Sequence, residues 1–346
     1  MFKIIRKKRL NPTVTLMDIQ APLIARKAEP GQFIILRVDE AGERIPLTIA
    51  DYDREKGTVT IIFQIVGATT EKLNHLEEGD SLRDFVGPLG IASHTEGLKK
   101  VAVIGGGVGS AIAYPIAKKL HAQGAEVHAI VGFRNKDLVI LEDEFRAVSD
   151  LCKVMTDDGS YGEKGLVTNA LKSLLDAGEQ YDEVIAIGPL VMMKFVCQLT
   201  KEYNVKTVVS MNPIMIDGTG MCGGCRVTVG GEVKFACVDG PDFDGHQVDY
   251  AELMNRNGVY REREVLRNRV DWACGRASVY DGENHYTFTD QPVAVMNSAC
   301  EGCPLQRYTV TSNCQHCMAQ RCLQACRFGA ITMTHPVSYT HLRAHE

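Results

Sequence analysis

Short stretches of alternating apolar and polar residues dominate the first 95 positions of the chain. β-Branched residues are frequent in three of these stretches, at residues 13–19, 32–38 and 58–66. Turn-forming pairs such as Pro30-Gly31 separate them, which is typical of short strands in an antiparallel sheet. The pattern therefore predicts a small antiparallel β-barrel over residues 1–97.

From residue 100 onward, apolar strand-like runs alternate with helical periodicity. The strand-like runs occupy residues 101–104, 126–131, 153–156, 183–187 and 207–209, and the helical patterns occupy residues 110–123, 141–149, 165–177 and 191–203. Regular alternation of this kind is typical of a mostly parallel sheet with helices on both faces. We therefore expect an α/β domain over residues 98–210.

Composition divides the remainder of the chain. A domain over residues 211–262 begins with a stretch rich in glycine, cysteine and aspartate, and the charged helical pattern at 251–275 runs into a linker over 263–290. A second cysteine-rich segment occupies residues 291–334. Residues 335–346 match neither pattern, so we give them no functional weight and leave open whether they are native.

Charge and hydropathy exclude two classes of protein. Lys and Arg number 38 against 43 Asp and Glu, for a net charge of −5, which argues against a nucleic-acid binder. No apolar run reaches the roughly 18 residues needed to span a membrane. The basic N-terminus lacks the long apolar stretch and cleavage site of a signal peptide. We therefore expect a cytoplasmic protein.

Cysteine is the residue whose distribution is unusual. Of the 12 cysteines, only Cys152 and Cys197 precede residue 220. In a reducing compartment, such clustering indicates metal or iron–sulfur ligation rather than a set of disulfides. The pattern predicts redox chemistry in the last third of the chain.

A glycine-rich turn joins the first strand of the predicted α/β domain to its first helix. The residues are Gly105, Gly106, Gly107, Val108 and Gly109. Glycines permit a close backbone approach, and the following helix N-terminus offers N–H donors to a phosphate. The match to G-x-G-x-x-G is imperfect, so a tight turn without a ligand is the alternative. Arg134, after the next strand, is a candidate partner of a 2′-phosphate or a solvated surface arginine.

Two segments of the predicted barrel carry further candidates. In Arg44-Ile45-Pro46-Leu47-Thr48, the arginine suits a bidentate grip on phosphate and the threonine can hydrogen-bond a ring system. Residues 64–73 predict a strand, a glycine turn and a helix start. The alternative is an ordinary hairpin followed by a helix that Thr69 or Thr70 caps.

The first cysteine group follows a C-x2-C-x11-C pattern in a glycine-rich loop. Its members are Cys222, Cys225 and Cys237, and Asp217 is the nearest further donor. Because [2Fe–2S] clusters need four ligands and accept backbone N–H bonds, we favour such a cluster. A zinc knuckle with Asp217 as its fourth ligand is the alternative.

The second cysteine group lies between residues 300 and 326. Its members are Cys300, Cys303, Cys314, Cys317, Cys322 and Cys326. Cysteines at this density favour a [4Fe–4S] site, although Arg327 stands where proline usually follows the last cysteine. Zinc binding is the competing interpretation.

Taken together, residues 1–262 resemble the ferredoxin–NADP reductase superfamily. Within it they are most similar to the small electron-transfer subunits of sulfide dehydrogenase and of NADH-dependent ferredoxin:NADP oxidoreductase, to which the dihydroorotate dehydrogenase electron-transfer subunit is related. The resemblance rests on Pro30-Gly31-Gln32-Phe33, residues 44–48, Gly87-Pro88-Leu89-Gly90, the glycine turn with Tyr114-Pro115, residues 156–162, Gly188-Pro189 and the first cysteine group. Residues 291–334 resemble instead the iron–sulfur region of [FeFe]-hydrogenases.

The resemblance implies a multidomain β and α/β architecture with defined cofactor sites. It implies an antiparallel FAD-binding barrel, a Rossmann-like parallel-sheet nucleotide domain, a [2Fe–2S] loop domain and a ferredoxin-like tail. FAD would be held by Arg44, Pro46, Leu47, Thr48, Phe63, Gln64, Ile65, Thr69 and Thr70. NAD(H) or NADP(H) would be held by residues 105–109, Asp157, Asp158 and Gly159. Asp217 with Cys222, Cys225 and Cys237 would hold the [2Fe–2S] cluster; the dihydroorotate relatives have cysteine at the first of these positions.

These implications define the expected function. The chain would pass electrons between NAD(P)H, FAD, a [2Fe–2S] cluster and a larger flavin and iron–sulfur subunit in a hetero-oligomer, with ferredoxin as a further candidate partner. We nominate no catalytic side chain, because hydride transfer between two cofactors needs none. The alternatives are electron delivery to dihydroorotate dehydrogenase and a non-catalytic nucleotide-binding scaffold with structural zinc.

Overall fold

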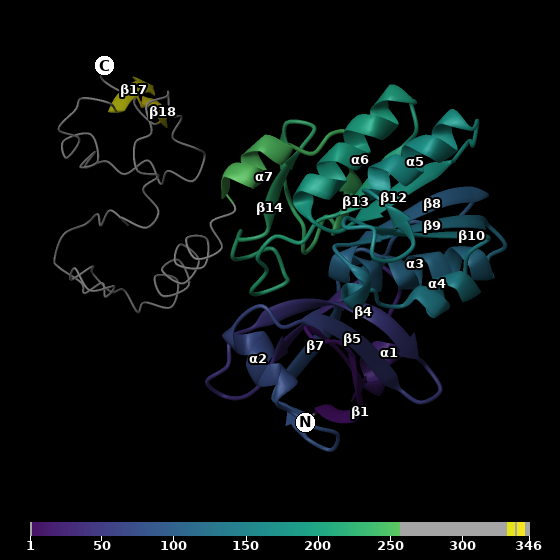
Figure 1. The fold of residues 1–346 in the computed structure, drawn as a ribbon. Helices are drawn as coiled ribbons and strands as arrows, with labels where there is room; N and C mark the ends of the chain where they lie inside the picture. The colour runs from purple at the N-terminus through teal and green to yellow at the C-terminus, as the bar shows by residue number, and fades with distance from the viewer. Residues whose placement is uncertain (1, 257–330, 336–337, 343–346) are drawn as a thin grey trace. The chain divides into compact units, whose positions relative to one another are not determined.

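The computed structural model describes residues 2–256, 331–335 and 338–342 (Figure 1). The chain divides into two units, Met1–Asn255 and Arg256–Glu346. Residues 257–330 are not described, so the predicted linker and all six cysteines of the second group lie outside the described residues. In the described part of the chain, no helix is long and apolar enough to cross a membrane.

Residues 2–89 form a seven-stranded antiparallel sheet with the order β6-β1-β2-β5-β4-β3-β7. Its strands are β1 (Phe2–Asn11), β2 (Val14–Gln20), β3 (Phe33–Arg37), β4 (Ile45–Asp53), β5 (Thr58–Gln64), β6 (Ser81–Leu82) and β7 (Asp84–Leu89), and the short helices are α1 (Pro22–Ala25) and α2 (Ala68–Asn74). One residue separates β6 from β7, yet they lie at opposite ends of the sheet, so the sheet curls almost into a barrel. This confirms the predicted antiparallel barrel in its outline.

The barrel core follows from the alternation in its strands. Side chains of successive residues point to opposite faces of a strand, so every second residue of β3 and β5 faces inward. Phe63, Ile61 and Ile34 are fully buried there, together with Phe85 of β7. Residues on the outer face of the same strands remain available for packing against the next part of the chain.

The second sheet is parallel except at one edge. Its order is β11-β10-β9-β8-β12-β13-β16. The strands are β8 (Lys100–Gly106), β9 (Glu126–Phe133), β10 (Leu151–Thr156), β11 (Glu163–Lys164), β12 (Glu183–Ile187), β13 (Thr207–Ser210) and β16 (Asp242–Asp244). The chain moves outward from β8 to β11 and then returns to the other side of β8, so the strand order reverses between β8 and β12. Ligands of open α/β sheets bind at such a reversal, beyond the carboxyl ends of the strands.

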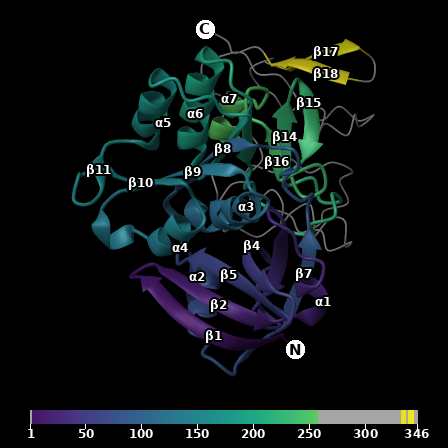
Figure 2. The same cartoon turned by 90° about the vertical axis from the view of Figure 1, so that its right-hand side faces the viewer.

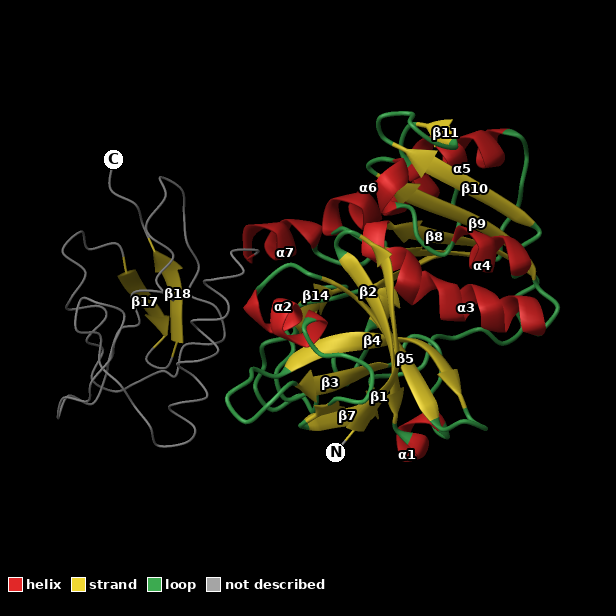
Figure 3. Ribbon diagram, turned by 60° about the horizontal axis from the view of Figure 1, so that its bottom comes forward, coloured by secondary structure: helices red, strands yellow, loops and turns green. Residues whose placement is uncertain are grey.

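Helices cover both faces of this sheet, as predicted. They are α3 (Ser110–Ala122), α4 (Glu142–Ala147), α5 (Val167–Asp176) and α6 (Leu190–Glu202), with 3₁₀ turns η1 (Gly107–Gly109) and η2 (Lys136–Leu138). In β8, Val101 and Val103 pack in the core under α3 and α4, whereas Ala102 and Ile104 pack in the core under α5 and α6. Figure 3 shows α3 and α4 on one face and α5 and α6 on the other.

Helix α3 joins the parallel sheet to the barrel (Figure 2). Val14 and Ile62, on the outer face of the barrel, belong to the same apolar core as Ala113 of α3. Beside this core, Lys118 Nζ lies 2.8 Å from a carboxylate oxygen of Asp51, which is in β4. The barrel and the α/β sheet therefore share one packed interface.

Residues 211–256 add a small lobe to the first unit. It contains the hairpin of β14 (Arg226–Val229) and β15 (Glu232–Phe235) and the helix α7 (Tyr250–Arg256). Strand β16 pairs antiparallel with β13, so a segment with little sequence periodicity extends the parallel sheet. In the second unit, β17 (Ile331–His335) pairs antiparallel with β18 (Ser338–Leu342). The expected boundary between residues 334 and 335 falls inside β17.

Candidate functional site

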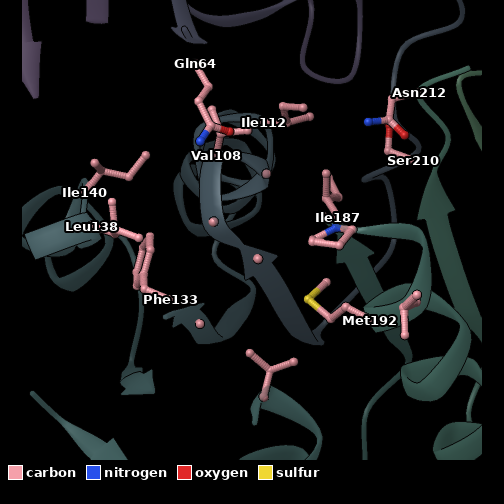
Figure 4. Close-up of a pocket in the computed structure, with 18 of the residues that line it drawn as sticks. Gln64, Val108, Ile112, Phe133, Leu138, Ile140, Ile187, Met192, Ser210 and Asn212 are labelled. Atoms are coloured by element: carbon pink, nitrogen blue, oxygen red, sulfur yellow. The ribbon is translucent and has the colours of Figure 1, made fainter. Parts of the chain in front are cut away.

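A cavity of about 760 Å³ lies where the barrel, the glycine turn and the small lobe meet. Figure 4 shows Phe133, Leu138 and Ile140 on one side of the glycine turn, and Ile187 and Met192 on the other. Its lining is mostly apolar, with a few polar groups. Among the residues expected to bind cofactors, the lining contains Pro46, Thr48, Gln64, Gly106, Gly107, Val108, Gly109, Arg134 and Asp157.

The glycine turn is shaped by close backbone packing. A Cβ on Gly109 would lie 2.5 Å from the Ile187 carbonyl oxygen, and Gly107 has a left-handed φ of +54°. These constraints place successive backbone N–H groups at the start of α3, a 13-residue helix. Ser110, its first residue, is fully buried and its Oγ has no hydrogen-bond partner in the described part of the chain. Since such a turn favours a bound anion, these residues fit the phosphates of a nucleotide.

Replacing Gly109 by alanine should weaken nucleotide binding at this turn. The new Cβ would meet backbone atoms of Ile187 and Gly188, at 2.5 and 2.7 Å, and backbone cannot yield as a flexible side chain does. We expect a loss of about 1–3 kcal/mol in unfolding free energy and a rise of about tenfold or more in the nucleotide dissociation constant. Gly67→Ala is the control, because a Cβ there meets nothing within 4 Å. Equal nucleotide affinities of both variants and the parent would contradict the assignment.

The barrel residues expected at the flavin have different surroundings. Pro46 and Thr48 of β4 and Gln64 at the end of β5 line the cavity. Phe63 is only 1% exposed, so its side chain belongs to the barrel core. Leu47 and Ile65 pack against the same core from outside. None of these three residues lines the cavity, in contrast to the neighbouring Pro46, Thr48 and Gln64.

The expected residues near α2 have roles within the fold. Thr70 Oγ1 accepts hydrogen bonds from the backbone N–H groups of Val66 and Gly67, at 3.0 and 3.1 Å, and so supports the helix start. Thr69 Oγ1 donates to a carboxylate oxygen of Glu43 at 3.3 Å. Neither threonine lines the cavity. The N-cap of α2 is Gly67, so neither threonine is the cap that the sequence left open as an alternative; Thr70 supports the helix start from the third helical position.

The second group of expected nucleotide residues follows strands β9 and β10. Arg134 and Asp157 are exposed and line the cavity. Asp158 and Gly159 lie in the adjoining turn, outside the cavity lining. The Asp158 carboxylate accepts the backbone N–H of Ser160 at 2.9 Å, and hydrogen bonds from Ser160 lower the pKa of this carboxyl. Asp158 therefore supports the turn that presents Asp157.

The four expected cluster ligands come together in the small lobe. Cys225 Sγ lies 3.1 Å from Cys237 Sγ, and both residues are buried. The Asp217 carboxylate accepts the backbone N–H of Cys222 at 2.7 Å. Burial is the largest cause that raises the pKa of Cys237, and the nearby Asp217 and Cys222 contribute to the increase. The structure thus brings the Cys225 and Cys237 sulfurs into contact and places Asp217 beside Cys222.

These donors form two pairs rather than one cage. Within the described ranges, no three His, Cys, Asp or Glu side chains converge closely enough to hold one metal ion. The loop between the donors bends at Gly218, Gly220 and Gly223, whose φ angles are +73°, +82° and +66°. A glycine-rich loop with two pairs of donors fits a cluster with two irons, since each iron takes two protein ligands.

The cluster loop packs directly on the barrel. A Cβ on Gly218 would lie 2.7 Å from Leu89 Cδ1 and 2.8 Å from Ile35 Cδ1. Cys225 and Cys237 belong to the same apolar core as Phe33, which also lines the cavity. Packed apolar side chains thus occupy the space between the cavity and the paired thiols.

Comparisons with known proteins agree with this arrangement. Residues 212–249 match the family described as the iron–sulfur cluster binding domain of dihydroorotate dehydrogenase B. A Thermotoga maritima protein named as a homologue of the dihydroorotate dehydrogenase B (NAD(+)) electron transfer subunit is 47% identical over 264 residues, which cover 76% of this chain and 93% of that protein. The chain belongs to this family of electron transfer subunits.

Two further relatives support the assignment. An uncharacterised Clostridium beijerinckii protein is 55% identical over 272 residues, covering 76% of this chain and 92% of that protein. A solved structure of an NADH-dependent reduced ferredoxin-NADP oxidoreductase, described in connection with flavin-based electron bifurcation, aligns with a TM-score of 0.72 at 46% identity. The alignment covers 77% of this chain and 96% of that one. The predicted flavin and iron–sulfur electron-transfer subunit is thereby confirmed.

The electron transfer subunit also has cavity residues that the sequence analysis missed. Ser210, at the end of β13, and the nearby Asn212 place polar groups in the cavity wall (Figure 4). Behind them, Ser93 Oγ donates to the carboxyl group of the half-buried Asp242 at 2.5 Å, and burial raises the pKa of this carboxyl. Ser93 and Asp242 are 149 residues apart, so no local pattern could have indicated their contact.

Proposed function

We propose that this subunit passes electrons between a nicotinamide nucleotide, FAD and a [2Fe–2S] cluster, and from there to a larger partner subunit, in the manner of a ferredoxin–NAD(P) reductase. One observation carries the proposal: a single cavity is walled by the barrel and the glycine turn, and it shares its packed core with the paired thiols. When bound, the flavin supplies the exchange between a hydride and single electrons. The protein supplies position and surroundings.

The residues of the chain have distinct tasks in this proposal. Pro46, Thr48 and Gln64 orient the flavin ring from the barrel side, and the turn at Gly106–Gly109 binds the nucleotide phosphates through backbone N–H groups. Apolar side chains such as Met192 exclude water from the reacting centre, which preserves the hydride from side reactions. The Asp217 and cysteine loop holds the cluster against the barrel wall, so the distance between the two redox sites is fixed.

The type of cluster and the remaining partners extend the same proposal. Two donor pairs in one glycine-rich loop favour [2Fe–2S] over a mononuclear zinc site. We propose that the cysteines between residues 300 and 326 hold a further cluster, of the [4Fe–4S] type, and that ferredoxin is a candidate electron partner. The relative named as an electron transfer subunit supports a hetero-oligomer with a larger subunit. Cysteine usage favours the cytoplasm as its location.

The purified full-length protein provides the test. We expect flavin and iron–sulfur bands in its absorption spectrum, FAD in the denatured extract, and bleaching of both bands when NADH is added without oxygen. A colourless protein that contains zinc would contradict the proposal and favour the scaffold alternative.

Electron delivery to dihydroorotate dehydrogenase is the second candidate function. The match of residues 212–249 to the dihydroorotate dehydrogenase B family favours it. Asp217 favours the other branch, because the family resemblance implies a cysteine at that position in the dihydroorotate relatives. Purification of the native complex from its source separates the two, since the larger subunit either oxidises dihydroorotate with NAD⁺ or does not.

Nucleotide choice depends on two exposed side chains in the cavity wall. Asp157 favours the free ribose hydroxyls of NADH, whereas Arg134 could pair with a 2′-phosphate. We expect NADH to reduce the flavin faster than NADPH, and Arg134→Ala to slow only the NADPH reaction, by about tenfold. Stopped-flow reduction with each nucleotide measures this, with Lys136→Ala as the control for a neighbouring exposed cation. A strong preference for NADPH that Arg134→Ala abolishes would overturn the assignment to NADH.

A further inference from the structure

Arg44 contacts the cluster loop rather than the cavity. It immediately precedes β4 and its side chain is exposed, yet its Nε donates a hydrogen bond to the backbone carbonyl oxygen of Ile216 at 3.0 Å. The two residues are 172 positions apart. This bond therefore ties the first strand segment of the proposed flavin site to the lobe that carries the cysteines.

The position of Ile216 determines the position of Asp217. One carboxylate oxygen of Asp217 accepts the backbone N–H of Thr219 at 3.0 Å, and the other accepts that of Cys222 at 2.7 Å. The next residue, Gly218, is seated between side chains of the barrel. Gly218 therefore fixes the loop just after Asp217, and the hydrogen bond from Arg44 to Ile216 restrains it just before Asp217.

A guanidinium group can serve two neighbours at once. It has five N–H donors in one rigid plane, and Nε accounts for only one of them. Among the described residues, the two Nη groups of Arg44 have no acceptor, so they remain available for a phosphate. Lysine has a single ammonium group on a flexible chain and cannot reproduce both contacts with fixed geometry.

We propose that Arg44 is a positioning residue of the iron–sulfur cluster: its Nε–H holds the Ile216 carbonyl and thereby sets Asp217, while its Nη groups stay available for the flavin phosphates. The inference rests on the proposed function, because it takes Asp217 as a cluster ligand. The inference assigns Arg44 to both the proposed flavin site and the proposed cluster site. Loss of Arg44 should then disturb the cluster even where no flavin is bound.

The test compares cluster properties of Arg44→Gln and Arg44→Lys with the parent, each as the full-length protein with FAD bound and after FAD removal. We expect the Gln variant to bind FAD more weakly. In the FAD-free samples we expect iron release to a chelator to be about three- to tenfold faster than in the parent, with altered electron paramagnetic resonance g-values. Arg44→Lys should show the same changes in the cluster, because it also lacks the Nε donor.

Arg54 provides a matched control. It follows the other end of β4, is exposed, and likewise donates to a backbone carbonyl, that of Ala28, at 3.0 Å. Arg54→Gln should leave iron release and g-values unchanged. If Arg44→Gln and Arg44→Lys lose FAD affinity but keep the parent's cluster in FAD-free samples, Arg44 serves the flavin alone and the positioning role is refuted. A parent protein without a cluster would instead overturn the proposed function, and this inference with it.

Discussion

Replacing Cys225 by alanine should abolish the iron–sulfur signal of the subunit while leaving hydride transfer from NADH to the flavin intact. Cys225 is 1% exposed, and its sulfur lies 3.1 Å from that of Cys237, so the two thiols are placed to bind the cluster together. Removal of a residue that only hydrogen-bonds a metal ligand lowers metal affinity by about 10- to 100-fold. Removal of a ligand itself should lower it further. We expect electron delivery to the partner subunit to fall by about 100-fold or more.

Two measurements separate this effect from general damage. Stopped-flow reduction of the flavin by NADH reports on the cavity, and electron paramagnetic resonance of the reduced protein reports on the cluster. Cys197→Ala is the control, since Cys197 is a buried cysteine of α6 whose sulfur contacts the Tyr250 hydroxyl at 3.2 Å. If Cys225→Ala retains the parent's resonance signal, the cluster is bound elsewhere. If Cys225→Ala loses both the resonance signal and the reduction of the flavin, the variant has lost its fold and not only its cluster.

Local patterns were sufficient to predict the two sheets and the glycine turn between the first strand and helix of the second. Alternation in residues 58–66 anticipates β5, because Val59, Ile61 and Phe63 face the barrel core, whereas the other face carries the partly exposed Thr60 and the exposed Gln64. The glycine turn could be predicted because a close approach to Ile187 permits no side chain at Gly109. The proposal for Cys222 and Cys225 likewise rests on their local spacing, because a cluster requires closely spaced thiolates.

Contacts between distant segments could not be predicted in this way. Strand β16 has only three residues, and its place beside β13 depends on pairing such as Val209 with Phe243, which no periodicity encodes. Ser210 becomes a cavity residue only because β13 ends there. The family resemblance implied that Phe63 binds the flavin. Because its side chain is buried in the barrel core, only its backbone is left for such a role. The type of a side chain does not indicate whether the backbone of that residue binds a ligand.

The fourth ligand of the cluster can be tested through its chemistry. A carboxylate oxygen is a harder donor than a thiolate, and cluster potentials respond to ligand type and charge. Asp217→Cys should therefore keep a [2Fe–2S] cluster but change its reduction potential and g-values, whereas Asp217→Ala should weaken or lose the cluster. Redox titration followed by electron paramagnetic resonance measures both properties in the same samples.

The structure also offers a second role for this aspartate, which a further variant distinguishes. Its oxygens accept the backbone N–H groups of Thr219 and Cys222, so Asp217 could shape the loop without touching iron. The side-chain amide in an Asp217→Asn variant keeps one carbonyl oxygen for these bonds but is a neutral and weaker ligand. If the loop role is the whole role, Asp217→Asn should retain the parent's potential and g-values. We expect it to change both, because each carboxylate oxygen has a second lone pair that the backbone bonds leave available for iron.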